Sequence, residues 1–352
     1  MISHYALHNV TETEPCNAGG VYLRRFPSAV RNILSPLGGM VAEESAGVEI
    51  RFVTEADGFR ITLGAEPPCV APSETSRLEV FVFRGDFFHS RHLLEEGRQN
   101  HLTVTDIGGV LRTRFASLSP EALADCRFSP NVWRIQIGRF SAALIELSTF
   151  GKPSRPPRPD ELPAKRWLAY GSSITNGGNT SGHHLTYIYQ AAHHLGIDVF
   201  NQGLSGSCLC ETEVADYLAA RQDWDIITLE LGVNMRQDFS PEDFAQRAAH
   251  LVAALARAHP DKPIGLISIF PNADLPPFAM SAETAVARRQ RAFVEILQDL
   301  TSKSRGKVFF LNGSSILKEF RGLSTDLIHP SDFGHIEMGR WLAAQLTAHL
   351  GD

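Results

Sequence analysis

The sequence predicts an α/β protein with two domains, an antiparallel β-sandwich or jelly roll followed by a three-layer, doubly wound parallel sheet. Three observations support this prediction. The chain has 352 residues, which is enough for two domains of about 100–200 residues each. Residues 1–151 contain many short runs of alternating polarity, whereas residues 165–352 alternate short apolar runs with helical patterns. A proline-rich segment, residues 152–164, separates these two patterns.

The N-terminal pattern begins with two clear strands. Residues 48–53 and residues 59–63 both alternate apolar and polar side chains, which is typical of a strand buried on one face. Turn-forming residues at positions 55–58 lie between them, so we predict a β-hairpin here. Further strands are expected at residues 78–83, 101–104, 132–137 and 142–147, and a helical turn is expected at residues 119–124.

The segment between the two patterns contains five prolines within residues 152–164. Proline lacks a backbone N–H and fixes φ, so this segment is not expected to join a sheet or a helix interior. Such a composition instead favours an extended, semi-rigid connector. We therefore place the N-terminal β-sandwich domain at residues 1–151, the linker at residues 152–164 and the C-terminal domain at residues 165–352.

The C-terminal pattern alternates strands with helices. The apolar runs are short and often β-branched, as expected for strands that helices cover on both faces. Five strands alternating with helices predict a parallel sheet with right-handed crossovers. The strands are expected at residues 167–170, 198–201, 226–231, 264–270 and 308–311. The helices are expected at residues 184–195, 213–221, 241–258, 282–301 and 331–350.

The composition limits the classes of partner. Hydrophobic residues make up 43% of the chain and charged residues 20%, as in an ordinary globular protein. The formal net charge of −6 is mild and argues against nucleic acid or an anionic membrane surface as a partner. No apolar run approaches the ~20 residues that a membrane span requires, and residues 1–5 lack the pattern of a signal peptide. Five irregularly spaced cysteines argue against a disulfide framework and for a reducing, cytoplasmic location.

Chemically active side chains follow several of the predicted strands. Loops at the carboxyl ends of the strands form the site in a doubly wound sheet. Ser172 and Ser173 follow the first predicted strand, and Asp326 and His329 follow the last one. A serine hydroxyl becomes a nucleophile only when a base removes its proton, and imidazole can do so near neutral pH. Asp326 lies three residues before His329 and can orient the imidazole from the same loop.

The neighbouring loops offer hydrogen-bond donors for an oxyanion, which an acyl-transfer intermediate requires. These donors are the backbone N–H of Ser173, the backbone N–H of Gly206 and the side-chain amide of Asn234. Glycine lets a substrate approach the backbone closely, and an amide donates without carrying charge. The sequence therefore supplies the parts of an acyl-transfer site, and this chemistry requires no metal or cofactor.

Four blocks at the strand ends resemble the motifs of one superfamily. In order they are Gly171-Ser172-Ser173-Ile174-Thr175, Asn201 to Gly206, Gly232-Val233-Asn234, and Asp326-Leu327-Ile328-His329-Pro330. Together they resemble the SGNH (GDSL-like) hydrolase superfamily over residues ~165–352. The resemblance implies a flavodoxin-like form of the three-layer sheet. It also implies Ser173 as the nucleophile, His329 and Asp326 as the rest of the triad, and Ser173, Gly206 and Asn234 as oxyanion-hole donors.

Two positions depart from the usual motifs of that superfamily. Its usual Gly-Asp-Ser is Gly171-Ser172-Ser173 here, and its usual Asn-Asp is Asn234-Met235. The family register favours Ser173 over its neighbour Ser172 as the nucleophile. Both missing carboxylates support the site in that superfamily, so their loss concerns the subgroup more than the reaction. The variant blocks are similar to those of a bacterial subgroup with an N-terminal β-sandwich, in which several members are carbohydrate esterases that remove acetyl groups.

We therefore expect a cytoplasmic serine esterase that acts on a small-molecule or oligosaccharide ester, with short O-acetyl groups on carbohydrate as the leading substrate. No cofactor, metal, nucleic acid or membrane partner is expected, and a homo-oligomer is left open. One alternative is a general short-chain aryl or lipid esterase without a carbohydrate role. Another is a non-catalytic carbohydrate-binding protein. His335, in the last predicted helix, is expected to pack or to cap rather than to act.

Overall fold

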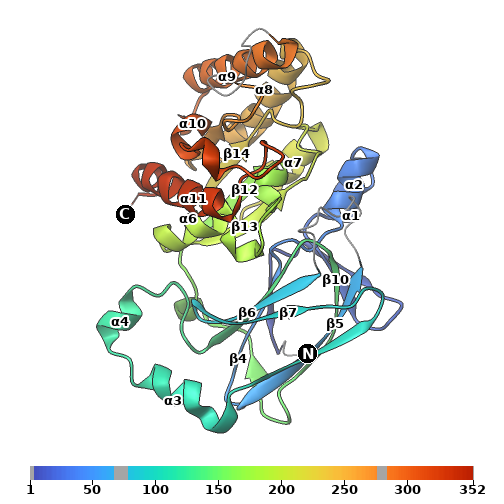
Figure 1. The fold of residues 1–352 in the computed structure, drawn as a ribbon, viewed down its shortest axis with the longest axis vertical. Coiled ribbons are helices and arrows are strands. Elements are labelled where there is room, and N and C mark those ends of the chain that lie inside the picture. Colours follow the sequence, from blue (N-terminus) through green and yellow to red (C-terminus); the bar gives the residue numbers. More distant parts are fainter. Residues whose placement is uncertain (1–3, 67–77, 276–283, 352) are drawn as a thin grey trace.

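The structure, a computed structural model, describes residues 4–66, 78–275 and 284–351. Its N-terminal region is built from two antiparallel sheets, and its C-terminal region is built from one parallel sheet with helices around it (Figure 1). This is the predicted fold class. In the view of Figure 1 the antiparallel sheets lie in the lower half and the parallel sheet in the upper half.

The two antiparallel sheets pack face to face as a sandwich. The first sheet has the spatial order β1 (Ala6–His8), β4 (Glu49–Thr54), β9 (Val132–Ile137), β6 (Glu79–Arg84) and β7 (Phe87–Leu93), and β11 (Ser154–Arg155) also pairs with β4. The second sheet has the order β2 (Glu12–Pro15), β3 (Val21–Arg24), β10 (Ser141–Ser148), β5 (Gly58–Glu66) and β8 (Gln99–Thr105). One hydrophobic core joins both sheets, and it includes Leu23, Ile50, Ile135 and Leu144.

The predicted hairpin of residues 48–53 and 59–63 is wrong, although both strands exist. β4 belongs to the first sheet and β5 to the second, so the turn between them carries the chain across the sandwich. Phe52 and Phe59 meet edge to face inside the core, with ring centroids 5.0 Å apart. Alternating polarity predicts that a strand has one apolar face. It does not predict in which of the two sheets the strand lies, because both sheets turn an apolar face toward the same core.

The expectation that β4 is buried on one face only is also wrong. Glu49 and Arg51 are buried, although they point away from the sandwich core. Arg51 donates two hydrogen bonds to Asp198 of the C-terminal region, at 2.5 and 2.9 Å, and one to Glu49 at 2.8 Å. Arg134 of β9 donates to both oxygens of Glu49, at 2.9 and 2.6 Å. The polar face of this sheet is therefore covered by the C-terminal region and carries a paired ionic network.

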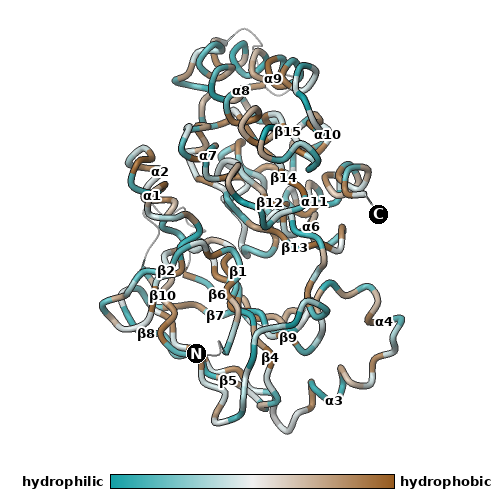
Figure 2. Tube along the Cα trace, turned by 180° about the vertical axis from the view of Figure 1, so that it is seen from behind, coloured by the Kyte–Doolittle hydropathy of each residue, from teal (hydrophilic) through white to brown (hydrophobic). Residues whose placement is uncertain are grey.

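The described part of the N-terminal region contains four α-helices: α1 (Ser28–Arg31), α2 (Pro36–Ala42), α3 (Val110–Ala116) and α4 (Pro120–Ala124). The predicted helical turn at residues 119–124 is confirmed by α4, whose first turn is capped by Ser119 Oγ accepting from the N–H of Ala122 at 3.2 Å. α3 and α4 bury none of their residues and project to one side of the sandwich in both overall views (Figures 1 and 2).

The proline-rich segment is more ordered than expected. Ser154 and Arg155 form β11 and pair with β4, and residues Pro159–Glu161 form a 3₁₀ turn. Both strand residues are non-proline, so the ladder loses no N–H here. Glu161 is buried and accepts hydrogen bonds from the Arg155 guanidinium at 2.7 and 2.8 Å. The expectation that this segment joins no sheet is therefore wrong for two residues, whereas the domain boundaries stay a prediction.

The parallel sheet has the strand order 2-1-3-4-5, which is the flavodoxin-like order. In space its strands are β13 (Asp198–Gly203), β12 (Arg166–Gly171), β14 (Ile226–Glu230), β15 (Ile264–Ile267) and β16 (Val308–Leu311). All five predicted strands are present. The middle strand, β14, is entirely buried because it has neighbours on both edges and helices on both faces.

Seven α-helices are found in the described part of the C-terminal region: α5 (Ser173–Asn176), α6 (Tyr187–Leu195), α7 (Thr212–Ala220), α8 (Pro241–Ala258), α9 (Ala285–Lys303), α10 (Gly313–Ile316) and α11 (Asp332–Leu346). The predicted helix at 241–258 is confirmed residue for residue. Residues 282 and 283 of the helix predicted at 282–301 lie outside the described residues, and α9 runs from Ala285 to Lys303. In Figure 2 the apolar colour concentrates along the strands, whereas α8 and α9 alternate between both colours.

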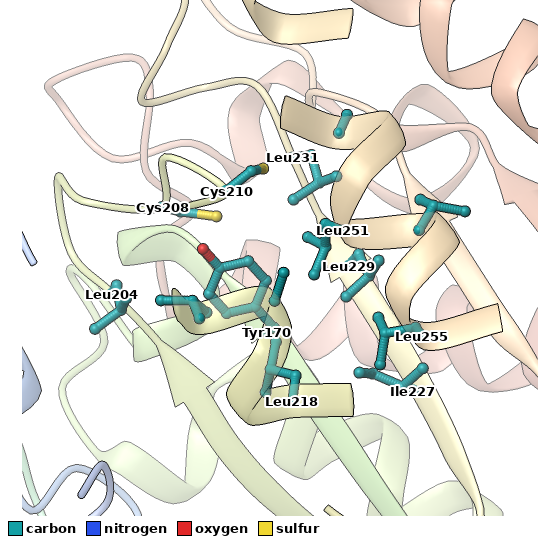
Figure 3. Packing of buried hydrophobic residues seen from close by; sticks show 14 of the residues in the cluster. Tyr170, Leu204, Cys208, Cys210, Leu218, Ile227, Leu229, Leu231, Leu251 and Leu255 are labelled. Carbon is teal, nitrogen blue, oxygen red and sulfur yellow. The ribbon is translucent and has the colours of Figure 1, made fainter. Parts of the chain in front are cut away.

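The helices form two outer layers around the sheet. Apolar side chains of α6, α10 and α11 form one core with one face of the sheet, and those of α7, α8 and α9 form another with the opposite face. Figure 3 shows the second core, where Tyr170 of β12 lies among Leu204, Leu218 and Leu229. Residues of α1 and α2, including Val30 and Val41, belong to this same core. The N-terminal region therefore completes the packing of the C-terminal one.

In the described part of the chain, we find no helix that combines the length and the apolar character needed to cross a bilayer.

Candidate active site

Ser173 lies where the first strand of the parallel sheet turns into a helix. β12 ends at Gly171, and Ser173 is the first residue of the short helix α5. Ser172 is the N-cap of α5, and its Oγ accepts from the N–H of Ile174 at 3.2 Å. This turn fixes Ser173 at the carboxyl edge of the sheet, with its side chain partly exposed.

The structure brings Ser173, His329 and Asp326 into one hydrogen-bonded chain. Ser173 Oγ lies 2.6 Å from His329 Nε2, and His329 Nδ1 lies 2.7 Å from Asp326 Oδ2. Ser173 and His329 are 156 residues apart in the sequence. They come together because the end of β12 and the segment before α11 lie at the same edge of the parallel sheet. The arrangement has the geometry of a nucleophile, a base and an orienting acid.

The loop that carries the acid and the base is tightly closed on itself. Asp326 Oδ1 accepts from the backbone N–H groups of Ile328 and His329, at 3.0 and 2.9 Å. Leu327 between them adopts a left-handed φ of 57°, which is unfavourable for a branched side chain. The N–H of Ser324 donates to the carbonyl of His329 at 2.7 Å and closes the loop. The backbone therefore presents both side chains in a fixed relative orientation.

The carboxylate of Asp326 is held in its ionised form. Partial burial tends to raise its pKa, but hydrogen bonds from the N–H groups of Ile328 and His329 and from the imidazole outweigh burial and hold the pKa below its ordinary value. Asn179 adds a further donor, with its Nδ2 2.8 Å from Asp326 Oδ2. Asn179 was not predicted as a site residue, since nothing in the local pattern connects it with a loop near the end of the chain.

The candidate oxyanion donors line the next loops of the same sheet edge. Asn234 follows β14, and its Oδ1 accepts from the N–H of Cys208 at 3.1 Å. This contact leaves the Nδ2 group of Asn234 as the free donor end of the amide. Among the described residues, no protein group accepts a hydrogen bond from Asn234 Nδ2 or from the backbone N–H of Ser173 or Gly206. These donors are thus available to a bound molecule.

Gly206 lies in a left-handed turn between β13 and α7, with φ of 69°. A Cβ at this position would lie 3.0 Å from Leu37 Cδ2, which belongs to α2 of the N-terminal region. Glycine therefore serves both the backbone conformation and the close approach of the neighbouring helix.

The N-terminal region supports the same loop with polar contacts. The buried guanidinium of Arg25 donates to the carbonyls of Asn201 and Gly203 at 3.1 and 3.0 Å. In α5, Asn176 Nδ2 donates to Glu44 Oε2 at 3.1 Å and to Ser205 Oγ at 2.9 Å. The sandwich thus reaches the nucleophile helix and the Gly206 loop within one chain. Sequence reasoning left the role of the N-terminal region open, because none of these contacts is local.

Ser172 is completely buried and does not face His329. Its N–H and its Oγ both donate to Glu230 Oε2, at 2.7 and 2.6 Å. Glu230 is the last residue of β14 and is 1% exposed. Burial raises the pKa of Glu230 to about 7, and the hydrogen bonds from Ser172 and Thr175 oppose that increase. Glu230 was not predicted as a site residue, although a glutamate at the end of a mostly apolar strand was the available signal.

Two further residues from the sequence analysis occupy structural positions. His335 is completely buried, its Nδ1 accepts from the N–H of Tyr187 at 3.2 Å, and burial lowers its pKa to about 4. It packs, as expected, instead of facing the serine. Met235 is also completely buried and belongs to the core with α7 and α8. An unpaired carboxylate in this apolar surrounding would be costly.

Within the described ranges, no three or more histidine, cysteine, aspartate or glutamate side chains are grouped so as to hold a metal ion. The geometry at the sheet edge instead suits acyl transfer by protein groups: a serine, its base, the acid that orients the base, and nearby donors.

Comparison with known proteins identifies a family and several solved structures of similar fold. A family model described as the GDSL-like lipase/acylhydrolase family matches residues 164–346, which is more than half of the chain. A salicylyl-acyltransferase from a tetracycline biosynthetic pathway is 17% identical with a TM-score of 0.78, and the match covers 99% of this chain and 96% of that one.

Two carbohydrate esterases also share the fold along nearly the whole chain. A family two carbohydrate esterase from Clostridium thermocellum, in complex with cellohexaose, is 13% identical with a TM-score of 0.61, over 98% of this chain and 99% of that one. A family two carbohydrate esterase from Cellvibrio japonicus is 14% identical with a TM-score of 0.61, over 99% of this chain and 95% of that one. At such identities the likeness establishes the fold, with the N-terminal sandwich included.

None of the curated proteins compared with this chain is significantly similar to it. The family model covers all four motif blocks and the whole parallel sheet. The chain therefore belongs to the GDSL-like lipase/acylhydrolase family and is a hydrolytic esterase.

Proposed function

We propose that the protein is a serine esterase that hydrolyses short-chain acyl esters through an acyl-enzyme, with O-acetyl groups on carbohydrate as its substrate. The observation that supports this most directly is the hydrogen-bonded chain from Ser173 Oγ through His329 to Asp326, with distances of 2.6 and 2.7 Å. A serine placed in this way can lose its proton as it attacks a carbonyl.

In the first half of the reaction, Ser173 Oγ attacks the ester carbonyl and His329 Nε2 accepts the hydroxyl proton. Asp326 accepts a hydrogen bond from Nδ1 and stabilises the imidazolium. The tetrahedral intermediate then collapses, the bond to the alcohol oxygen breaks, and His329 donates its proton to that leaving alcohol. An acyl group now sits on Ser173.

In the second half, water attacks the acyl carbon while His329 Nε2 accepts a proton from that water. Collapse of this intermediate breaks the bond to Ser173 Oγ, which regains a proton from His329, and the carboxylic acid leaves. In both halves the N–H groups of Ser173 and Gly206 and the Nδ2 of Asn234 donate to the oxyanion. Each such donor is worth about 10²–10³ in kcat at comparable sites.

The choice of acetylated carbohydrate rests on similarity. Two proteins with the same two-part architecture are carbohydrate esterases, and one of them was solved with cellohexaose. The same acyl-enzyme would also allow transfer of the acyl group to an acceptor other than water, and one protein of this fold is named a salicylyl-acyltransferase. The site residues, the substrate and the cytoplasmic location are all parts of this proposal.

A Ser173→Ala variant tests the proposal. Wild-type protein should hydrolyse p-nitrophenyl acetate, and the variant should lose at least about 10³-fold of kcat, because the acyl-enzyme can no longer form. Ser302→Ala is the matched control, since Ser302 is exposed on α9 and its Oγ donates to the carbonyl of Asp299. Equal, slow hydrolysis by wild type and Ser173→Ala would favour a non-catalytic carbohydrate-binding protein and refute the esterase proposal.

A substrate series then separates the esterase alternatives. We expect acetyl esters to turn over faster than longer acyl esters, and an acetylated oligosaccharide to release acetate. Preference for long acyl chains, with no release of acetate from the oligosaccharide, would instead identify a general aryl or lipid esterase. Analysis of the products in the presence of an added alcohol measures how much of the acyl group goes to water.

A further inference from the structure

A buried acid lies directly behind the nucleophile turn and has no part in the triad. Glu230 ends the central strand β14 and is 1% exposed. Its Oε2 accepts three hydrogen bonds, from the N–H of Ser172 at 2.7 Å, from Ser172 Oγ at 2.6 Å and from Thr175 Oγ1 at 3.2 Å. All three donors flank Ser173 in the sequence. Burial of a carboxyl group is costly, so its presence here calls for a function.

The turn is shaped to admit this carboxylate. A Cβ on Gly171 would lie 2.7 Å from Glu230 Oε2 and 2.2 Å from Thr175 Oγ1, so only glycine allows both groups to approach the backbone. Tyr187 OH lies 2.7 Å from Thr175 Oγ1 and donates to it, because Thr175 uses its own proton toward Glu230. The chain of hydrogen bonds from α6 to β14 thus passes beneath the nucleophile helix.

The same residue also contacts the loop of the candidate oxyanion donors. The Cys208 thiol donates to the backbone carbonyl of Glu230 at 3.5 Å, and the Cys208 N–H donates to Asn234 Oδ1 at 3.1 Å. Glu230 therefore fixes two structures at once: the turn that carries Ser173 through its side chain, and the Cys208 loop through its main chain.

We infer that Glu230 is a positioning residue. By accepting hydrogen bonds from the backbone N–H and the hydroxyl of Ser172, it holds Ser173 Oγ in line with His329. The inference rests on the proposed function, since it concerns the same serine. It also accounts for the departure at position 172. The carboxylate that the superfamily carries on the residue before its nucleophile is supplied here by the neighbouring strand, and Ser172 supplies the hydroxyl that binds it.

Glu230→Gln tests this role because it preserves size and replaces a carboxylate by an amide. At about pH 8.5, kcat for p-nitrophenyl acetate should fall about 10- to 100-fold with KM within about 2-fold, because a small displacement of the nucleophile weakens catalysis more than binding. The rate at which an organophosphate labels Ser173 should fall by a similar factor. A purely structural role would leave both rates unchanged in the folded variant.

Exchange of the two side chains provides a rescue. Ser172→Asp alone places two carboxylates in contact in a buried site and should inactivate the protein. The double variant Ser172→Asp/Glu230→Gln returns the carboxylate to the position usual in the superfamily and gives it an amide donor. We expect it to recover at least about 5-fold in kcat over Ser172→Asp. If Glu230→Gln does not fold, Ser172→Ala takes its place, with an expected loss of about 3- to 10-fold in kcat at constant KM.

Glu161→Gln is the matched control. Glu161 is also a buried glutamate and is paired with Arg155, but it lies in the proline-rich segment. Loss of the Glu161 carboxylate should lower the free energy of unfolding and leave kcat for p-nitrophenyl acetate unchanged. Folded Glu230→Gln with wild-type kcat and wild-type labelling overturns the inference, while a Ser173-dependent wild-type activity still supports the proposed function. If Ser173→Ala is as active as wild type, the proposed function itself fails.

Discussion

At the residue scale, the site depends on a loop that holds an acid three residues before a base. Asp326 accepts from the N–H groups of Ile328 and His329 through one oxygen and binds the imidazole through the other. Leu327 adopts a left-handed conformation so that this can happen. The spacing was visible in the sequence, but the strained residue and the donor from Asn179 depend on the folded chain.

Asp326→Asn should therefore reduce kcat by about 10³-fold with little change in KM, because an amide that donates to Nδ1 would favour the wrong imidazole tautomer. Steady-state kinetics on p-nitrophenyl acetate measure the loss. Asn179→Ala, which removes only one donor to Asp326, should cost about 10-fold or less. If Asp326→Asn retains most of the wild-type kcat, another group orients His329 and the assignment of the acid is incorrect.

At the scale of elements, β14 links the core to the site. Four of its five residues are apolar or threonine, and the fifth, Glu230, is buried at its carboxyl end. Periodicity could predict this strand because burial on both faces gives a continuous apolar run. Periodicity could not predict the role of Glu230, because its hydrogen-bond partner Ser172 follows a different strand, β12. For the same reason, alternation predicted β4 and β5 correctly but assigned them to one hairpin.

The buried carboxyl of Glu230 predicts a specific pH dependence of stability. Its pKa is about 7 in the folded protein against 4.5 ordinarily. Below pH 4.5 the carboxyl group is protonated in both the folded and the unfolded protein, so it does not lower the free energy of unfolding. As the pH rises from 4.5 to about 7, the group ionises more readily in the unfolded protein, and the free energy of unfolding falls. From about pH 5 to about pH 8, wild type should lose up to about 3 kcal/mol relative to Glu230→Gln.

Denaturant unfolding of both proteins across that pH range measures the difference in free energy of unfolding. We expect the variant to gain relative stability at the alkaline end, where it is also less active. Parallel pH profiles for the two proteins would mean that Glu230 ionises normally. Loss of stability together with loss of activity at about pH 8 would instead point to general disruption of the turn.

At the scale of the whole molecule, the sandwich and the parallel sheet are joined by buried charges. Arg51 of β4 binds both oxygens of Asp198 at the start of β13, and His8 Nε2 lies 2.9 Å from the carbonyl of Val199. The positive charge of Arg51 holds the pKa of Asp198 at about 2 in spite of burial, which by itself would raise it. One side of the interface cannot be changed without leaving a buried charge on the other.

Asp198→Asn should accordingly lower the free energy of unfolding by about 3 kcal/mol, because Arg51 would keep its charge with only Glu49 as partner. Lys303→Gln is the control: Lys303 and Asp299 form an exposed pair on α9, with 72% and 53% of their side chains accessible, and its loss should cost at most about 0.5 kcal/mol. Urea unfolding gives both values. Equal effects in the two variants would argue against a structural role for the interface network.

Most helices and strands, and the residues of the candidate site, could be predicted from the amino-acid sequence. Period-two and period-3.6 patterns specify strands and helices because burial of an apolar face repeats along the chain. Ser173, Asn234 and His329 could be named because strand ends of a parallel sheet meet at one edge.

Three features could be read only from the folded chain: the pairing of the strands, the contacts of the sandwich with the candidate site, and the buried acid next to Ser172. Glu230, Arg25 and Glu44 act on groups more than fifty residues away. Such contacts depend on how two folded surfaces fit together, and no local periodicity encodes that fit.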